Sequence, residues 1–382
     1  MKSKILLRDT SFSIKFKLWK MLRNVLVLGL IAIYGCSDGS SSGDVGTQGF
    51  GVSGLLFENN LVMWFRETDN PNSAKLYPQM YFTRSDVSDF PVWGSFPEEF
   101  LFSGGVPRDG IPALTTPKFV GATSGEVTSY LREDDLVLGA VINGDVKAYP
   151  ENILWWHEIA NDEIGGEQVI MTLCPLTGTG IFFRKPLDGN SARELELLPV
   201  IETTWRKWKE LYPNTRVISE NTGISRNYTR YPYNSYRNEN SPPFAPLGSG
   251  RQVDNRFSPK HTILGLMVGD KQKAYPFSRL QPAPVVNDTF NGLDVLVVSE
   301  IGERLAIPYE RLLEGQLLTF TLESENPFRM RDNETGSTWN IKGEALDGQL
   351  AGKNLTQVPA YNAFWFAWAA FWPDTEVFGS SN

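Results

Sequence analysis

The sequence predicts an α+β fold dominated by antiparallel β-sheet, with an internal duplication that gives two pseudo-symmetric lobes. Three observations support this prediction. Short segments rich in apolar and β-branched residues alternate with Gly or Asp turns, and two segments have the pattern of helices. Pieces of the chain also recur, most of them 126 residues later and the tryptophan-containing piece 160 residues later. The 382 residues are enough for one large domain or for two equivalent halves.

The duplication is visible in ungapped matches between an earlier and a later part of the chain. The matching pieces are Leu138-Gly139 with Leu264-Gly265, Lys147–Pro150 with Lys273–Pro276, Asn161-Asp162 with Asn287-Asp288, and Trp205, Trp208, Pro213 and Thr215 with Trp365, Trp368, Pro373 and Thr375. His157 falls on Ala283 in the second copy, and Cys174 falls on Glu300. Since a residue of the shared scaffold should occur in both copies, this difference predicts a single site in the first copy.

The strands are expected where short apolar runs end in turn residues. Asn143-Gly144 lies between two of these runs and is a strong signal for a two-residue hairpin. The expected strands are Leu136–Ile142, Val146–Ala148, Gln168–Leu173 and Ile181–Phe183 in the first copy, Thr262–Val268, Lys273–Tyr275 and Val295–Val298 in the second, and a further strand at Leu317–Leu322.

Two helices are expected. Glu151–Ala160 follows a proline and carries apolar side chains along one stripe. Ala363–Trp372 is apolar nearly all round and precedes Pro373, so we expect a buried helix that ends there.

The first 35 residues have the pattern of a bacterial lipoprotein signal peptide. Lys and Arg residues precede an apolar run at Val25–Tyr34, which is shorter than the roughly 20 residues of a membrane span. Gly35-Cys36 resembles the lipoprotein processing box, which predicts a lipid on Cys36 and sorting to the outer membrane of a Gram-negative host. Residues 36–49 are predicted to form a flexible tether. Residues 50–382 are predicted to form one globular domain with repeats at about 110–225 and 256–382. An uncleaved anchor helix and a start at Met21 are alternatives.

The charge balance argues against nucleic acid as a partner. The chain has 36 Lys and Arg against 44 Asp and Glu, and removal of the basic signal segment makes the remainder more acidic. Phosphate backbones repel such a surface. The sequence also has no phosphate-binding glycine loop, zinc-protease helix motif or serine-hydrolase elbow.

Several long motifs resemble one known family. They are Asp109–Leu114, Pro117–Phe119, Trp156–Ile159 with Asn161-Asp162, Cys174–Thr179, Phe364–Trp368 and Pro373–Thr375. Together they resemble the bacterial and archaeal family called domain of unknown function 3179, over roughly residues 100–377. The resemblance implies export but no particular activity. Many members have a second Cys where this chain has Thr177, so this chain lacks their local dithiol.

The candidate site is built around Cys174 and His157. The turn after Cys174 is expected to bring backbone N–H groups beside the sulfur, where they would hold an anion or lower the thiol pKa. Further candidate binding residues are Asp109, Glu158, Thr177, Thr179 and Ser337, although Asp109 also fits an ordinary turn.

Three functions fit these residues. In the first, the protein is a non-catalytic binding or scaffold module of the cell envelope, and Cys174 and His157 are core residues. In the second, Cys174 and His157 ligate a soft metal, copper or zinc, with help from a residue such as Glu158. In the third, Cys174 is a nucleophile or redox thiol and His157 is its base. The sequence identifies neither the ligand nor the protein partner.

Overall fold

The computed structural model describes residues 111–185, 195–243 and 254–380, together with four two-residue strands near the N-terminus. These strands are β1 (Leu56–Phe57), β2 (Leu61–Val62), β3 (Trp64–Phe65) and β4 (Met80–Tyr81). The predicted signal segment 1–35, the lipidation site Cys36, the tether 36–49 and the candidate residue Asp109 all lie outside the described residues.

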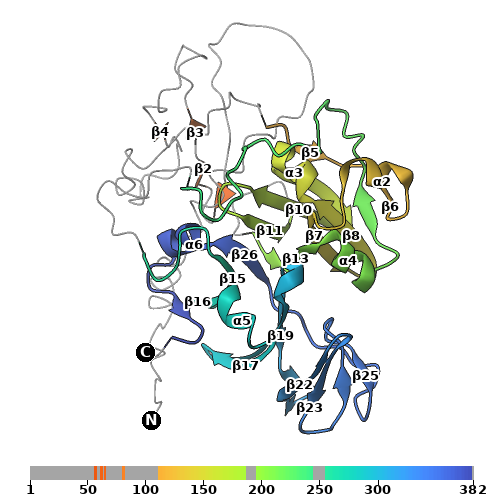
Figure 1. Cartoon of the computed structure of the whole chain (residues 1–382), viewed down its shortest axis with the longest axis vertical. Coiled ribbons are helices and arrows are strands. Elements are labelled where there is room, and N and C mark those ends of the chain that lie inside the picture. The colour runs from red at the N-terminus through yellow and green to blue at the C-terminus, as the bar shows by residue number, and fades with distance from the viewer. Residues whose placement is uncertain are drawn as a thin grey trace, which may run out of the picture.

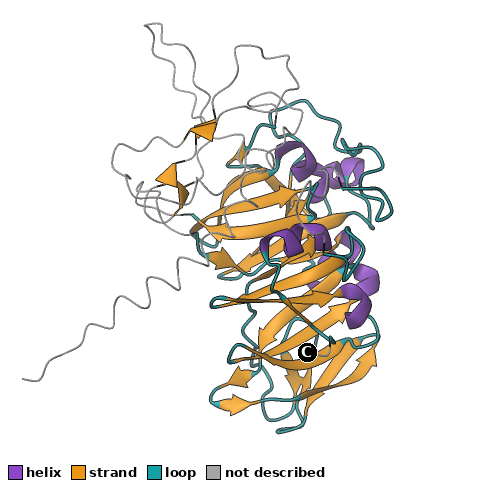
Figure 2. Cartoon of the chain, turned by 90° about the vertical axis from the view of Figure 1, so that its left-hand side faces the viewer, coloured by secondary structure: helices purple, strands orange, loops and turns teal. Residues whose placement is uncertain are grey.

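The fold is mostly β, with 43% of the described residues in strands and 14% in helices, and five sheets are arranged as a five-bladed β-propeller ring. The predicted α+β class with two lobes was therefore wrong. Figures 1 and 2 show that strands dominate the described chain and that the helices are few and short.

The first two sheets come from the first half of the chain and have five strands each. In spatial order, the first is β12 (Leu197–Leu198), β11 (Thr179–Arg184), β10 (Glu167–Cys174), β9 (Ile159–Ile164) and β5 (Leu114–Thr115). The second is β13 (Ile201–Thr204), β7 (Leu136–Ile142), β8 (Asp145–Pro150), β14 (Arg216–Ile218) and β6 (Phe119–Gly121).

The other three sheets come from the second half. The third is β26 (Ala360–Phe364), β15 (Thr262–Val268), β16 (Lys271–Pro276) and β27 (Glu376–Val377). The fourth is β17 (Val285–Phe290), β18 (Leu293–Glu300) and β19 (Leu305–Glu310), and the fifth is β22 (Phe320–Glu325), β23 (Phe328–Asp332), β24 (Thr338–Trp339) and β25 (Ala345–Asp347). A small pair, β20 (Leu312–Leu313) and β21 (Gln316–Leu317), connects the last two.

The helical segments are short, and only α3 and α5 connect strands of different sheets, whereas the others connect strands of one sheet. They are α2 (Gly125–Tyr130), α3 (Glu151–His157), α4 (Trp205–Leu211), α5 (Phe277–Leu280), the 3₁₀ turn η3 (Ile301–Glu303) and α6 (Trp365–Phe371). Two predicted helix bounds were wrong. Helix α3 stops at His157 because Glu158 adopts a left-handed φ of 54° and the chain enters β9. Helix α6 starts at Trp365 because the residues before it form β26.

The predicted hairpin at Asn143-Gly144 is confirmed. Strands β7 and β8 pair antiparallel across these two residues, which have φ values of 49° and 79°. Positive φ at both positions is what a type I′ turn requires, and it explains why this dipeptide is favoured here.

The recurring segments do not form separate lobes, because one hydrophobic core joins both halves of the chain. This core contains Val137 and Met171 from the first half together with Leu296, Ile307 and Trp339 from the second. The recurring pieces instead give sheets of similar build. The second and third sheets share the strand order β13-β7-β8-β14 and β26-β15-β16-β27, with the same parallel last pair.

A tryptophan packed on a glycine recurs in these two sheets. A Cβ on Gly139 would lie 2.2 Å from the Trp208 ring, and one on Gly265 would lie 2.1 Å from the Trp368 ring. Each indole N–H then donates to a threonine, Trp208 to Thr215 at 2.9 Å and Trp368 to the corresponding threonine at 3.0 Å. The glycine, tryptophan and threonine of the recurring motif thus form one packing unit.

Replacement of Gly139 tests this packing. We expect Gly139→Ala to lower the free energy of unfolding by about 2 kcal/mol or more, because the buried Trp208 ring has to shift. The control is Gly121→Ala, since a Cβ there meets nothing within 4 Å. Urea unfolding of the three proteins is the measurement, and equal midpoints for both variants would contradict the prediction.

Candidate functional site

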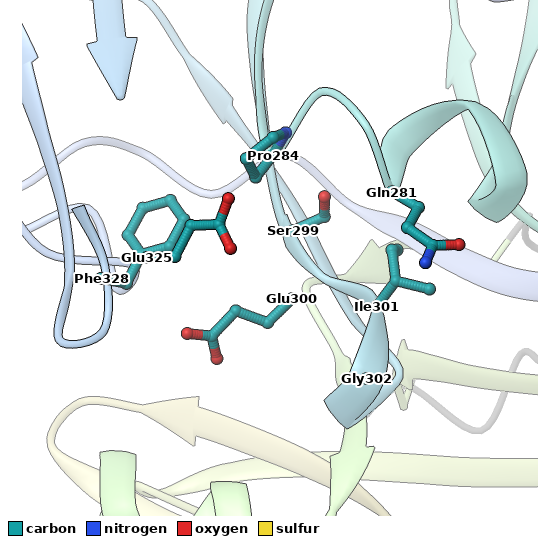
Figure 3. Close-up of a pocket in the computed structure, with 8 residues that line it drawn as sticks. All are labelled: Gln281, Pro284, Ser299, Glu300, Ile301, Gly302, Glu325 and Phe328. Atoms are coloured by element: carbon teal, nitrogen blue, oxygen red, sulfur yellow. The ribbon is translucent and has the colours of Figure 1, made fainter. Parts of the chain in front are cut away.

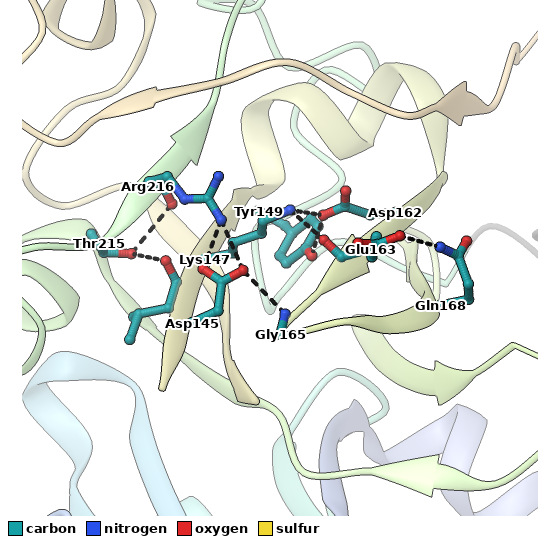
Figure 4. Close-up of polar contacts among 10 residues, drawn as sticks. Asp145, Lys147, Tyr149, Asp162, Glu163, Gly165, Gln168, Thr215 and Arg216 are labelled. Atoms are coloured by element: carbon teal, nitrogen blue, oxygen red, sulfur yellow. Dashed lines mark hydrogen bonds and ion pairs between the residues drawn. The ribbon is translucent and has the colours of Figure 1, made fainter. Parts of the chain in front are cut away.

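The recurring Lys-Ala-Tyr-Pro and Asn-Asp motifs form a buried polar clasp between neighbouring sheets (Figure 4). Lys147 Nζ on β8 lies 2.8 Å from Asp162 Oδ2 on β9, and the Tyr149 hydroxyl donates to the same oxygen at 2.8 Å. Lys147 and Asp162 are 4% and 7% exposed. Burial, followed by the charge of Asp162, raises the pKa of Tyr149 well above its usual value.

The same clasp joins β16 to β17 in the second half. Lys273 Nζ lies 2.7 Å from Asp288 Oδ2, to which Tyr275 donates at 2.9 Å. Because the clasp exists in both places, its carboxylates are explained by structure, and Asp162 has no special relation to Cys174.

His157 has a different environment from the one the sequence suggested. It ends α3, is 1% exposed, and both ring nitrogens have partners, the Pro112 carbonyl oxygen at Nδ1 and the Tyr228 hydroxyl at Nε2, each at 2.7 Å. Burial lowers its pKa. Since a carbonyl only accepts, Nδ1 carries the proton of the neutral ring and Nε2 accepts from Tyr228. Neither nitrogen is left for a thiol or a metal in this state.

Cys174 ends β10 and is 3% exposed. The following turn places the N–H groups of Leu176 and Thr177 and the Thr177 hydroxyl at its sulfur, and these contacts lower the thiol pKa. Burial of the thiol is the larger effect and raises its pKa, and the nearby Glu158 carboxyl raises it further. The pKa of Cys174 is therefore raised to about 12. The thiol is therefore neutral at physiological pH.

Glu158 is a buried carboxyl group next to this thiol. Its left-handed backbone turns the chain sharply from α3 into β9, and its side chain is enclosed, with the residue 3% exposed. Burial raises the pKa of Glu158 to about 8, although a long hydrogen bond of 3.4 Å from the Tyr233 hydroxyl acts the other way. At neutral pH the carboxyl is therefore mostly protonated.

The site is covered by residues 219–243, which contain no helix or strand and which we call the tyrosine segment. Three of its tyrosine hydroxyls reach the site: Tyr228 bonds His157, Tyr233 bonds Glu158, and Tyr236 donates to the Leu176 carbonyl at 2.8 Å. The fourth tyrosine, Tyr231, has a buried hydroxyl with no hydrogen-bond partner.

Sequence reasoning missed this cover. The signal available was the spacing of four tyrosines within nine residues, Tyr228, Tyr231, Tyr233 and Tyr236. No periodicity of helix or strand accompanies them, so the pattern gave no indication of what they contact.

Of the other candidate residues, two lie beside Cys174 and one lies in a different sheet of the fold. Thr177 and Thr179 are 5% and 2% exposed, and their hydroxyls bond each other at 2.5 Å in the turn after Cys174. Ser337 is fully buried between β23 and β24 of the fifth sheet, where its hydroxyl bonds Thr335 and accepts from the Leu350 N–H at 3.0 Å. The structure therefore groups Cys174 with Glu158 and the threonines and leaves Ser337 in a different sheet.

A protein metal site needs several ligand side chains that converge on one point. Among the described residues, no group of three or more His, Cys, Asp or Glu side chains is placed to hold a metal ion. With both His157 nitrogens engaged, the arrangement of the described residues does not fit the copper or zinc site considered from the sequence.

The family signature covers most of the chain. The family described as Protein of unknown function (DUF3179) matches residues 108–192 and 186–375, and the chain belongs to this family. No curated protein and no solved structure shows significant similarity to the chain. Within the described residues, no helix is long and apolar enough to cross a membrane.

The raised pKa of Glu158 predicts a pH-dependent stability. The folded protein retains this proton up to about pH 8, whereas the unfolded chain releases it near pH 4.5, so stability is lost as pH rises through this window. We expect the Glu158→Gln variant to gain stability relative to the parent between pH 5 and 8 by on the order of 3 kcal/mol. Urea unfolding at both pH values measures this difference.

The control for that comparison is Glu163→Gln, which removes an exposed carboxylate from β9, the strand that follows Glu158. It should follow the parent protein at both pH values. Parallel behaviour of the parent and Glu158→Gln would show instead that Glu158 is ionised in the folded protein.

Proposed function

We propose that this protein is a lipid-anchored binding or scaffold module of the cell envelope. The signal-like residues 1–35, the processing box before Cys36 and the Ser/Gly-rich tether support export and anchoring, on the periplasmic side of the outer membrane if the host is Gram-negative. The acidic composition supports a partner other than nucleic acid. The partner itself is a protein or a small molecule.

The observation that carries the non-catalytic part of this proposal is the enclosed, neutral thiol of Cys174. The thiolate is the nucleophilic form, and a pKa of about 12 leaves on the order of one thiolate per 10⁵ molecules at pH 7. The tyrosine segment also blocks approach to the sulfur. Both facts support a structural role for Cys174.

One observation favours the alternative of a thiol enzyme. The N–H groups of Leu176 and Thr177 point at the sulfur and would stabilise a thiolate once solvent entered. That chemistry requires displacement of the tyrosine segment, and His157 would first have to leave its bond with Tyr228 to act as a base.

Thiol labelling distinguishes these functions. We use the full chain with Cys36→Ser, in which Cys174 is the only thiol. We expect native Cys174 to react with a maleimide at pH 7 at least 100-fold more slowly than the unfolded chain, because the sulfur is covered and protonated. The His157→Asn variant should not slow native labelling further, and elemental analysis should find no stoichiometric metal.

Two other outcomes would contradict the binding-module proposal. Fast native labelling that is slowed by His157→Asn would identify an activated nucleophile. Protection that a chelator releases, together with about one copper or zinc per chain, would identify a metal site.

The anchor has a test of its own. With intact Cys36, we expect the protein to incorporate labelled palmitate and to sediment with membranes, whereas Cys36→Ser should lose the label and move to the soluble fraction. The Cys174→Ser variant is the matched control, because it removes the other cysteine and should keep the label. Equal labelling of the Cys36→Ser protein and its parent would rule out lipidation at Cys36.

A further inference from the structure

A cavity of ≈ 230 Å³ lies where β18 meets η3, beside the hairpin of β22 and β23 (Figure 3). Its lining includes Gln281, Ser299, Glu300, Ile301, Glu325 and Phe328. Figure 3 shows the carboxylates of Glu300 and Glu325 on the same side of this space as the Phe328 ring, with Ile301 and Gln281 opposite.

The cavity lies at the end of β18, which corresponds to the end of β10, where Cys174 lies in the first half of the chain. Strand β10 ends at Cys174 and strand β18 ends at Glu300, and each is the middle strand of three antiparallel neighbours. The tyrosine segment closes this place in the first half. In the second half the same place is hollow and carries a carboxylate.

The charges around the cavity favour a positive ligand. Glu300 Oε2 lies 2.7 Å from Lys207 Nζ, but Lys207 also pairs with Glu210 at 2.9 Å, so one ammonium serves two carboxylates. Glu325 is exposed and makes no ion pair within the described part of the chain. No Lys, Arg or His is among the residues that line the cavity. A second cation would therefore meet uncompensated negative charge.

The walls and the size set further limits on the ligand. The Phe328 ring, in a residue only 4% exposed, and the Ile301 side chain offer apolar contact for a short carbon chain, and a ring face attracts cations. The volume is below the usual range for drug-sized ligands, which is about 300–1,000 Å³. The cavity therefore suits a molecule of few carbon atoms.

We propose that this cavity is a binding site for a small organic cation, an aliphatic amine or guanidinium whose charge lies between Glu300 and Glu325 and whose carbon chain packs on Phe328. The inference rests on the proposed binding function and names its ligand class. It also places the ligand site in the second half of the chain, away from Cys174.

The test uses n-butylamine and n-butyrate, which have the same carbon chain and opposite charges. Each is titrated into the full chain, and the Ile301 methyl resonance, assigned with an Ile301→Val variant, reports binding at the cavity. We expect a saturable shift with butylamine, at millimolar concentrations for so small a ligand, and none with butyrate. Added salt should weaken the butylamine affinity.

The deciding variant is Glu325→Gln, because this exposed residue has no ion pair whose loss would disturb folding. We expect it to weaken butylamine binding roughly fivefold, the effect of one nearby charge in water. Its control is Glu323→Gln on the same strand, which pairs with Arg331 and does not line the cavity. This control should retain the parent affinity.

The inference is overturned if butylamine leaves Ile301 unshifted, if butyrate binds equally well, or if the two Glu variants behave alike. None of these results bears on the labelling of Cys174. The ligand site and the proposed function can therefore fail independently of one another.

Discussion

The fold depends on a buried lysine–aspartate–tyrosine clasp that fastens one sheet to the next. Lys147 Nζ is the most demanding group of this arrangement, since a buried ammonium is costly unless it is fully hydrogen-bonded. Here it meets the Asp162 carboxylate, the Glu163 carbonyl at 2.6 Å and the face of Phe119 at 4.1 Å. A lysine satisfied in this way fixes β8 against β9 more specifically than apolar packing would. The second clasp, at Lys273 and Asp288, does the same for β16 and β17.

The clasp also explains where the two candidate sites lie. Helix α3 bridges the clasped strands β8 and β9, and its left-handed exit at Glu158 turns that side chain toward the end of β10. In the second half the bridge is the shorter helix α5, and the end of β18 remains open beside the β22–β23 hairpin. The same arrangement of strands therefore encloses a neutral thiol at the end of β10 and leaves a carboxylate-lined cavity at the end of β18.

Local features could be predicted from the sequence, and long-range ones could not. The hairpin at Asn143-Gly144 follows from turn chemistry, which depends on neighbouring residues alone. The five-sheet arrangement does not, since the pairing of β13 with β7 joins residues far apart in the chain and no local pattern specifies it. The two-lobe prediction failed for the same reason, because the largest hydrophobic cluster contains residues of both halves of the chain. The cover over Cys174 was missed because the tyrosine segment has no periodicity, and its contacts exist only after folding.

An X-ray structure of the full chain crystallised with n-butylamine tests the central claim most directly, because it shows both places at once. We predict an ordered amine between Glu300 and Glu325, and an enclosed Cys174 whose tyrosine segment is in place. An amine or a metal beside Cys174 beneath a displaced tyrosine segment, with the second cavity empty, would contradict it.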